Sequence, residues 1–208
     1  MTPREAFTQA LAVRHSCKSF EADHEILPDD LRYILEAGRL APSSFGLEPW
    51  QFIVVKSPSK RQELMAACYG QRQIGECAEL VAILAKTGKF LDADGAYVSD
   101  MFARWGLPQE AYTAVKNMYR NYIAATNAKE WSIAQCHIAA ANMMNAAAAI
   151  GIDSCAIGGF HPQLVENALE INTDDDYTIA MLLPFGYRSK GQPARHRLLL
   201  DDIVTYLH

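Results

Sequence analysis

The spacing of hydrophobic residues predicts two helices near the start of the chain. In residues 1–13, Thr2 offers a cap, Pro3 suits the first helical position, and apolar residues recur along one face. Residues 28–40 repeat this pattern, because Pro28 is followed by two acids that complement the helix dipole and then by apolar residues at helical spacing. Both stretches are therefore expected to form helices with an apolar stripe.

The rest of the chain alternates short apolar runs with helical segments. Residues 51–56 and 80–85 have the length and composition of buried strands. Residues 132–150 are apolar nearly all round and rich in alanine, which predicts a buried helix. Polar interruptions and the small transfer energy of alanine argue against a membrane span there. Further helices are expected at 58–69 and 162–169, and further strands at 154–157 and 178–184.

Residues 87–130 follow no single period. Tyrosine, tryptophan, methionine and phenylalanine are mixed there with charged residues. We interpret the segment as broken helices that lie over a site. No repeat, low-complexity tract or linker-like stretch divides the sequence, so residues 1–208 are expected to form a single domain.

Composition and charge exclude several classes of protein. Half of the 208 residues are hydrophobic and 21% are charged, which excludes a disordered chain, collagen and a simple coiled coil. The net charge of −5 argues against a nucleic-acid partner, since nucleic-acid-binding domains usually carry a net basic face. The first residues lack the apolar run of a signal peptide, so a cytoplasmic protein without a membrane partner is expected.

The five cysteines are expected to be reduced. Their number is odd and no two form a Cys-x-x-Cys pair, which favours structural thiols in the cytoplasm. Cys17 stands beside Arg14 and Lys18, and such neighbours can lower a thiol pKa. A redox role and a packed thiol therefore both stay open for Cys17.

Several common cofactor and catalytic motifs are missing from the sequence. No Gly-x-Gly-x-x-Gly follows a predicted strand, and there is no Walker loop, no Gly-x-Ser-x-Gly and no His-Glu-x-x-His. A Rossmann dinucleotide site, a P-loop, an α/β-hydrolase and a zinc protease are therefore not expected, and no metal site is assigned. Any nicotinamide cofactor would bind without its usual fold.

Positive charge is concentrated in two stretches far apart in the chain. Residues 14–18 and 188–197 contain six of the 19 Lys and Arg residues and no acid. Guanidinium groups pair with two oxygens of a phosphate at once, so the two stretches would suit an anion pocket. Two solvated basic loops remain the alternative, because runs of charge usually face water.

Two further segments have the composition of a ligand site. Pro42, Ser43 and Ser44 end a predicted helix and offer hydroxyl and backbone N–H groups, although an ordinary helix-to-strand loop has the same composition. Gly158 and Gly159 follow a strand candidate, and backbone without a Cβ can approach a flat ligand closely. A tight turn is the alternative for the glycine pair.

These segments, in their order and spacing, resemble the nitroreductase family of flavin mononucleotide (FMN) enzymes from Arg14 to about Leu198. The resemblance is greatest to the oxygen-insensitive NAD(P)H nitroreductase branch. The residues that carry it are Arg14-His15-Ser16 with Lys18 and Phe20, Pro42-Ser43-Ser44 before Pro49-Trp50, Gln71-Arg72-Gln73, Ile157-Gly158-Gly159-Phe160 and Arg195-His196-Arg197.

The resemblance implies an α+β homodimer with a nitroreductase-like fold. A central, mostly antiparallel sheet would be flanked by helices, and C-terminal segments would wrap the partner. The implied function is the FMN-dependent, two-electron reduction of nitroaromatics, quinones or related small acceptors by NAD(P)H in a ping-pong mechanism. Because flavin N5 carries the chemistry, no catalytic side chain is expected. A specialised quinone or enone reductase of the same fold and a non-enzymatic flavin-storing protein stay open as alternatives.

The resemblance also assigns cofactor-binding residues by position. It implies phosphate ligands at Arg14, Ser16, Arg195 and Arg197, and contacts to the pyrimidine edge and ribityl chain from Lys18 and Gln73. The other subunit would contribute Pro42, Ser43 and Ser44. Backbone near flavin N5 would come from Gly158 and Gly159, and His15, Gln71 and Ile157 complete the set.

Gln73 departs from the family pattern, since many relatives carry lysine there. A neutral amide stabilises the anionic reduced flavin less than a cation does. A lower flavin potential is therefore expected, unless Lys18 compensates.

Overall fold

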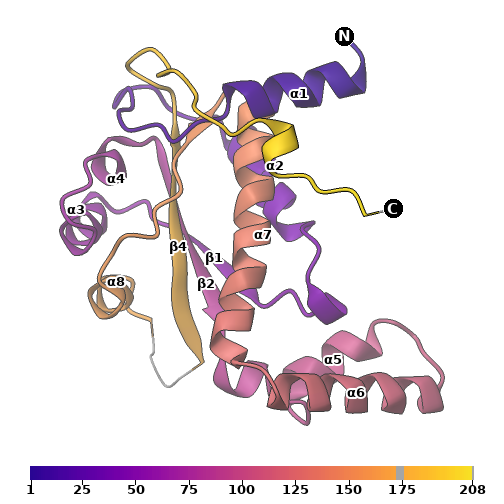
Figure 1. Cartoon of the computed structure of the whole chain (residues 1–208). Helices are drawn as coiled ribbons and strands as arrows, with labels where there is room; N and C mark the ends of the chain where they lie inside the picture. Colours follow the sequence, from indigo (N-terminus) through magenta and orange to yellow (C-terminus); the bar gives the residue numbers. More distant parts are fainter. Residues whose placement is uncertain (172–175, 208) are drawn as a thin grey trace.

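The computed structural model describes residues 1–171 and 176–207. Within these residues, a four-stranded antiparallel sheet stands between two layers of helices (Figure 1). Its strands are β1 (Trp50–Val54), β2 (Glu79–Lys86), β3 (Asp153–Ser154) and β4 (Tyr177–Gly186), in the spatial order β1-β2-β4-β3. The predicted α+β class with an antiparallel central sheet is therefore confirmed.

The helices agree closely with the predicted ones. They are α1 (Pro3–Val13), α2 (Pro28–Arg39), α3 (Pro58–Ala67), α4 (Gln73–Glu76), α5 (Ala96–Ala103), α6 (Gln109–Ala124), α7 (Ala128–Ala149) and α8 (Pro162–Ala168). Short 3₁₀ turns occur at η1 (Ser44–Gly46), η2 (Gly88–Phe90) and η3 (Leu200–Asp202). The hydrophobic pattern does not predict the single turn of α4, because four residues are too short to show a period. Helices α5 and α6 lie in residues 87–130, where only broken helices without bounds are expected.

The central strand β2 separates two hydrophobic cores. Successive side chains of a strand point to opposite faces, so Leu80 and Leu84 pack with α3, α4 and α8, whereas Val81 and Ile83 pack with α2 and α7. Both faces of β2 are buried, which explains its uninterrupted apolar sequence. The same division into two layers is visible in Figure 1, where α7 and α2 lie on one side of the sheet and α3, α4 and α8 on the other.

Residues 87–130 form their own small core below the sheet. Phe102 of α5, Tyr119 of α6 and Trp131 of α7 are buried together with Leu47. The Tyr119 hydroxyl donates to the carbonyl of Leu91 at 2.8 Å, which satisfies the polar end of this buried ring. The prediction of broken helices in this segment is confirmed.

Helix α1 begins as predicted but does not bury its apolar stripe. Thr2 and Glu5 form a reciprocal capping box, since each side chain accepts the backbone N–H of the other residue. Phe7, however, is 57% exposed, Leu11 also faces solvent, and the buried residue of the helix is Ala10. The stripe of α1 is therefore available to contact another molecule.

Two elements are less buried than their sequences suggest. Strand β1 was expected to be buried, yet Gln51 is exposed and Phe52 and Ile53 are only partly covered, because β1 pairs with β2 alone among the described residues. Helix α7 was expected to be buried all round, yet His137 and Ile138 face away from the sheet and are exposed. Across residues 1–171 and 176–207, no helix combines the length and apolar character needed to cross a lipid bilayer.

We expect Leu182→Ala to destabilise the fold by about 2–5 kcal/mol, as large-to-small changes in a packed core do. Leu182 is fully buried near the middle of β4 and exchanges backbone hydrogen bonds with Ile157. Urea denaturation followed by circular dichroism measures the change. The control Leu164→Ala alters a residue of α8 that is 53% exposed, and its effect should stay within about 0.5 kcal/mol. Equal losses in the two variants would contradict this description of the core.

Candidate functional site

The two basic segments of the sequence meet at the end of α1. The Arg195 guanidinium donates to the carbonyl oxygen of Leu11 at 2.7 Å and also to the carbonyl oxygen of Arg14. Gln192 donates to the carbonyl oxygen of Ala12 at 3.5 Å. The last carbonyls of a helix lack partners within the helix and carry partial negative charge, so they hold cations well. Residues 192–195 are thereby fixed across the final turn of α1.

The first basic segment continues beside β3. Ser16 forms a parallel bridge with Ser154, and the N–H of Cys17 donates to the Ser154 carbonyl at 3.0 Å. The Lys18 ammonium donates to the Cys155 sulfur at 3.4 Å. Backbone contacts with residues 187–189 hold the other side of the same segment. The segment is therefore placed mainly by main-chain bonds, with side-chain contacts such as that of Lys18 added to them.

Three arginines crowd together where these segments meet. The pKa of Arg14 is lowered, first by burial of its guanidinium and then by the positive charges of Arg195 and Arg197. Positive charges held close together repel one another, and a negative charge added beside them offsets that repulsion. The cluster is therefore suited to an anion, which favours the anion pocket over two solvated loops.

A buried carboxylate joins the two basic segments. His15 Nδ1 lies 3.5 Å from Asp153 Oδ1, and Asp153 Oδ2 accepts the backbone N–H of Arg188 at 3.1 Å. The side chains of His15 and Asp153 are only 12% and 9% exposed. The sequence does not predict a role for Asp153, because a single acid at the start of a short strand has no distinctive pattern.

Two glutamines extend the site along the glycine pair. Gln71 Nε2 donates to the Gly159 carbonyl at 3.0 Å, and Gln73 Nε2 donates to Gln71 Oε1 at 3.0 Å. A carbonyl oxygen can only accept, so Gly159 fixes the direction of both hydrogen bonds. Next to it, a Cβ added at Gly158 would meet no atom within 4 Å, which leaves this stretch of backbone open to a flat ligand.

Most of the predicted cofactor-binding residues lie in two groups, one at the end of α1 and the other around Gln71 and the glycine pair, and the contact of Lys18 with Cys155 links them. They come from the segment after α1, the loop before α4, the segment after β3 and the segment after β4 (Figure 1). The residues placed there are Arg14, His15, Ser16, Lys18, Gln71, Gln73, Ile157, Gly158, Gly159, Arg195 and Arg197. Arg14 and Arg197 are far apart in the sequence, and the hydrogen bonds from Arg195 to the end of α1 bring their two segments together.

The loop with Pro42, Ser43 and Ser44 does not join this group within the chain. The N–H of Ser44 donates to Gln135 Oε1 of α7 at 3.0 Å, and the Ser43 hydroxyl accepts the N–H of Glu48 at 2.9 Å. The loop thus packs on the α7 side of the sheet, whereas Gln71 and Gln73 lie on the α3 and α4 side. Its contribution to the site from another subunit stays a prediction.

The cysteines are buried thiols. Cys17 is 2% exposed, and burial raises its thiol pKa despite a hydrogen bond that it donates to the Ser19 carbonyl. Burial likewise raises the pKa of Cys68 to about 11 and that of Cys136 to about 12. A raised pKa keeps a thiol protonated and unreactive, so the structure favours the packed-thiol interpretation of Cys17.

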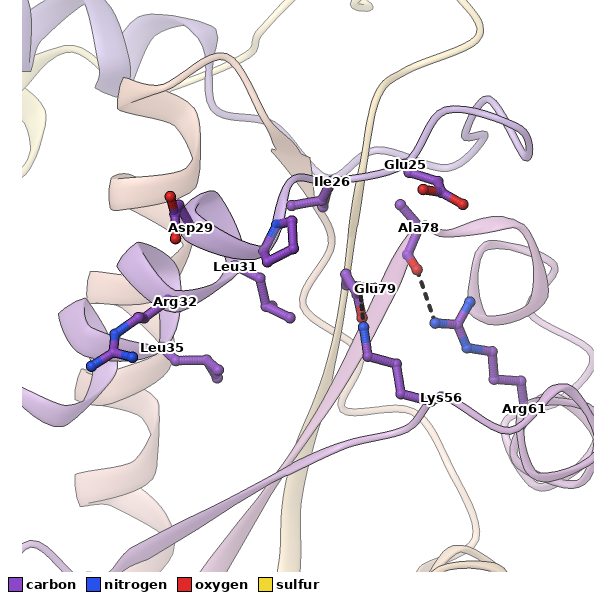
Figure 2. Close-up of a pocket in the computed structure, with 11 residues that line it drawn as sticks. Glu25, Ile26, Asp29, Leu31, Arg32, Leu35, Lys56, Arg61, Ala78 and Glu79 are labelled. Carbon is purple, nitrogen blue, oxygen red and sulfur yellow. Dashed lines mark hydrogen bonds and ion pairs between the residues drawn. The ribbon is translucent and has the colours of Figure 1, made fainter.

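A hollow of about 750 Å³ lies elsewhere, between α2, the end of β1 and α3 (Figure 2). Two of its cations are engaged, since Lys56 pairs with Glu79 and Arg61 donates to the carbonyls of Val55, Cys77 and Ala78. It contains none of the predicted cofactor-binding residues. Within the described residues, no cluster of His, Cys, Asp and Glu could hold a metal ion.

The family model for the nitroreductase family matches residues 11–187, and the chain belongs to this family. The Bacillus subtilis protein named "Putative NAD(P)H nitroreductase YfkO" is 32% identical over 207 residues, covering 93% of this chain and 94% of its own. A Haemophilus influenzae protein named "Putative NAD(P)H nitroreductase" is 33% identical, covering 98% of this chain and 97% of its own. The protein is therefore an oxidoreductase of the nitroreductase type.

A solved structure from the same family shows the same fold. The Exiguobacterium sibiricum protein, a "putative nitroreductase in complex with FMN", is 25% identical and superimposes with a TM-score of 0.80. The match covers 96% of each chain. The nitroreductase-like fold expected from the resemblance is confirmed.

We expect Arg14→Gln to leave the unliganded protein at least as stable as the native one, because it removes a guanidinium whose pKa is lowered by burial and by two other arginines. The same change should abolish stabilisation by inorganic phosphate. At ten times its Kd, phosphate adds about 1.4 kcal/mol to the free energy of unfolding, which raises Tm by a few degrees. Thermal denaturation in phosphate and in chloride of equal ionic strength measures both effects.

Arg4→Gln is the matched control for this experiment. Arg4 is exposed on the same helix α1, so its loss removes equal charge without touching the cluster. The control should keep the full phosphate effect. A phosphate effect that survives Arg14→Gln unchanged would show that the cluster is not an anion site.

Proposed function

We propose that the protein is an FMN-dependent oxidoreductase that uses NAD(P)H for the two-electron reduction of nitroaromatics, quinones or related small acceptors. The observation that carries the proposal is the meeting of both basic segments at the end of α1, with Lys18 linked through Cys155 to the segment that holds the glycine pair and its two glutamines. These groups match the parts of FMN, which has a phosphate at one end and a flat ring at the other. Membership of the nitroreductase family and the FMN-bound relative support the same cofactor.

The crowded arginines fit a phosphate. We assign Arg14, Ser16, Arg195 and Arg197 to the phosphate, with His15 beside them. Each charge-assisted hydrogen bond contributes about 1.5–3 kcal/mol. Three or four such bonds give roughly micromolar or better binding once the cost of association is subtracted.

The opposite end of the site fits the ring. We assign Lys18, Gln71 and Gln73 to the pyrimidine edge and ribityl chain, and the backbone of residues 157–159 to the region of N5. The Gln71 amide ties the Gly159 carbonyl in place, so the backbone beside the ring is held rigid. Rigid positioning of this kind lowers the entropy lost when reactants are brought together.

The protein contributes position and electrostatics to the reaction, and no side chain acts as a nucleophile. When bound, FMN would supply hydride transfer between NAD(P)H and the second substrate. We expect the two substrates to occupy one place in turn, which is the basis of a ping-pong mechanism. Delivery of two electrons avoids a nitro radical that oxygen could reoxidise.

We also propose that the chain works as a homodimer. Leu198, Leu199 and Leu200 are 71%, 72% and 68% exposed, and the stripe of α1 is uncovered. Contiguous exposed apolar residues usually mark an interface. A second copy would cover these surfaces and bring its own Pro42, Ser43 and Ser44 to the site. Light scattering on the purified protein measures the mass of the particle.

The visible spectrum of the purified protein is the first test of this function. We expect flavin absorption bands, release of FMN on denaturation, and oxidation of NADH or NADPH when a nitroaromatic or quinone is added. Double-reciprocal plots at several acceptor concentrations should give parallel lines. Bound flavin without any reductase activity would indicate the flavin-storing alternative, and activity restricted to one enone or quinone would indicate a specialised reductase. Absence of flavin after reconstitution would overturn the proposal.

We expect Gln73→Lys to raise the midpoint potential of the bound flavin by about 30 mV or more. Gln73 presents a neutral amide whose N–H is committed to Gln71, whereas an ammonium would stabilise the negative charge of reduced flavin. For a two-electron couple, 30 mV corresponds to a tenfold change in the equilibrium constant. The control Gln163→Lys places the same charge on exposed α8, and a spectroelectrochemical titration that finds equal potentials in the two variants would refute this role of Gln73.

A further inference from the structure

Asp153 is an acid placed among the cations of the site. Its carboxylate is 9% exposed and faces His15 from the segment after α1 and Arg188 from the segment after β4. Arg188 Nε lies 3.4 Å from Asp153 Oδ2. A buried negative charge repels a phosphate bound nearby, so a carboxylate here must have a compensating role.

The surroundings of His15 fix the position of its proton. Nδ1 lies 3.3 Å from the carbonyl oxygen of Val13 and 3.5 Å from Asp153 Oδ1. Both groups are acceptors, so Nδ1 carries a hydrogen in the neutral ring as well as in the charged one. Nε2 has no partner among the described residues and is left for a ligand.

The second oxygen of Asp153 holds the other basic segment. Oδ2 accepts the backbone N–H of Arg188 at 3.1 Å. The Arg188 guanidinium in turn donates to Gln192 Oε1 at 3.2 Å, and Gln192 donates to the carbonyl of Ala12 on α1. Asp153 thus stands in a closed path of contacts that begins and ends at α1, in which the contact with His15 is an ion pair when the ring is protonated and the other links are hydrogen bonds.

We propose that Asp153 is a positioning residue of the anion site. It holds His15 as the Nδ1–H form, which directs the unpartnered Nε2 to a phosphate, and it locks Arg188 so that the arginines after β4 stay beside Arg14. The proposal rests on the proposed function, because the phosphate is that of FMN. It assigns Asp153 no contact with the cofactor.

Asp153→Asn tests the assignment with an almost unchanged shape. An asparagine offers one acceptor and one donor, whereas His15 Nδ1–H and the N–H of Arg188 both need an acceptor, so one contact is lost. We expect the Kd of FMN for the apoprotein to rise about tenfold, as loss of such supporting contacts typically does. The Kd of riboflavin, which has no phosphate, should change less than twofold. Quenching of flavin fluorescence measures both constants.

Two further variants separate positioning from general damage to the fold. Asp23→Asn makes the same change at an exposed position between α1 and α2 and should leave both Kd values unchanged. His15→Asn keeps a donor that reaches Asp153 but lacks Nε2, so it should weaken FMN and spare riboflavin. If Asp153→Asn fails to fold, the Kd values of His15→Asn for FMN and riboflavin still test the proposed role of His15 Nε2.

The tautomer of His15 gives a readout that does not depend on any flavin. In ¹⁵N NMR spectra of the apoprotein, the neutral His15 ring should show a protonated Nδ1. A protonated Nε2, an unchanged Kd of FMN in Asp153→Asn, or equal weakening of FMN and riboflavin would overturn the proposal. A native protein that binds neither flavin would overturn the proposed function instead, and the NMR result would still decide the arrangement around His15.

Discussion

The antiparallel pairing of β2 with β4 is the constraint on which the rest of the molecule depends. The two strands pair from Glu79 to Lys86, and both are buried on both faces. Burial of this extent requires helices on each side, and the alternation of side chains along β2 assigns α2 and α7 to one layer and α3, α4 and α8 to the other. The end of β4 lies beside the start of β3, since Gly186 pairs with Asp153, so the segment after β4 begins next to Asp153. The arginines of that segment meet the segment after α1 close to this junction.

The site holds several positively charged arginines close together on a rigid support. Main-chain bonds and Asp153 fix the segment around Ser16, while Arg195 is held by the carbonyl end of α1. These contacts keep Arg14 close to two other guanidiniums, and its pKa is lowered first by burial and then by those two charges. Repulsion of this kind is relieved when an anion is added. Functional sites commonly hold such locally unfavourable arrangements against the stability of the surrounding fold.

Most of the fold could be predicted from the sequence, because its signals are local. Thr2 and Pro3 predict the start of α1, and two apolar runs predict β2 and β4. The extent of burial could not be predicted in the same way. The stripe of α1 and the edge strand β1 have core-like sequences, yet within the described residues the stripe stays exposed and β1 is only partly covered. A pattern of hydrophobic residues predicts that a surface will be covered and does not say by which molecule.

Only part of the site could be predicted from the sequence. The basic and glycine-rich segments stand out in the sequence, and in the structure most of them have contacts with one another. Asp153 does not stand out in the sequence, because its role depends on His15 and Arg188, which are 138 and 35 positions away in the chain. The direction of the Gln71 and Gln73 amides is equally invisible in the sequence, since it is set by the carbonyl of Gly159.

The attachment of Arg195 to α1 also has a consequence for the order of assembly. During synthesis β4 emerges before Arg195, so the sheet and both cores can form before the Arg195 guanidinium reaches α1. The contacts with α1 then hold the last basic segment on elements that are already folded. The arginine cluster is thereby completed late, and an immature chain can hold its fold before the cluster has formed.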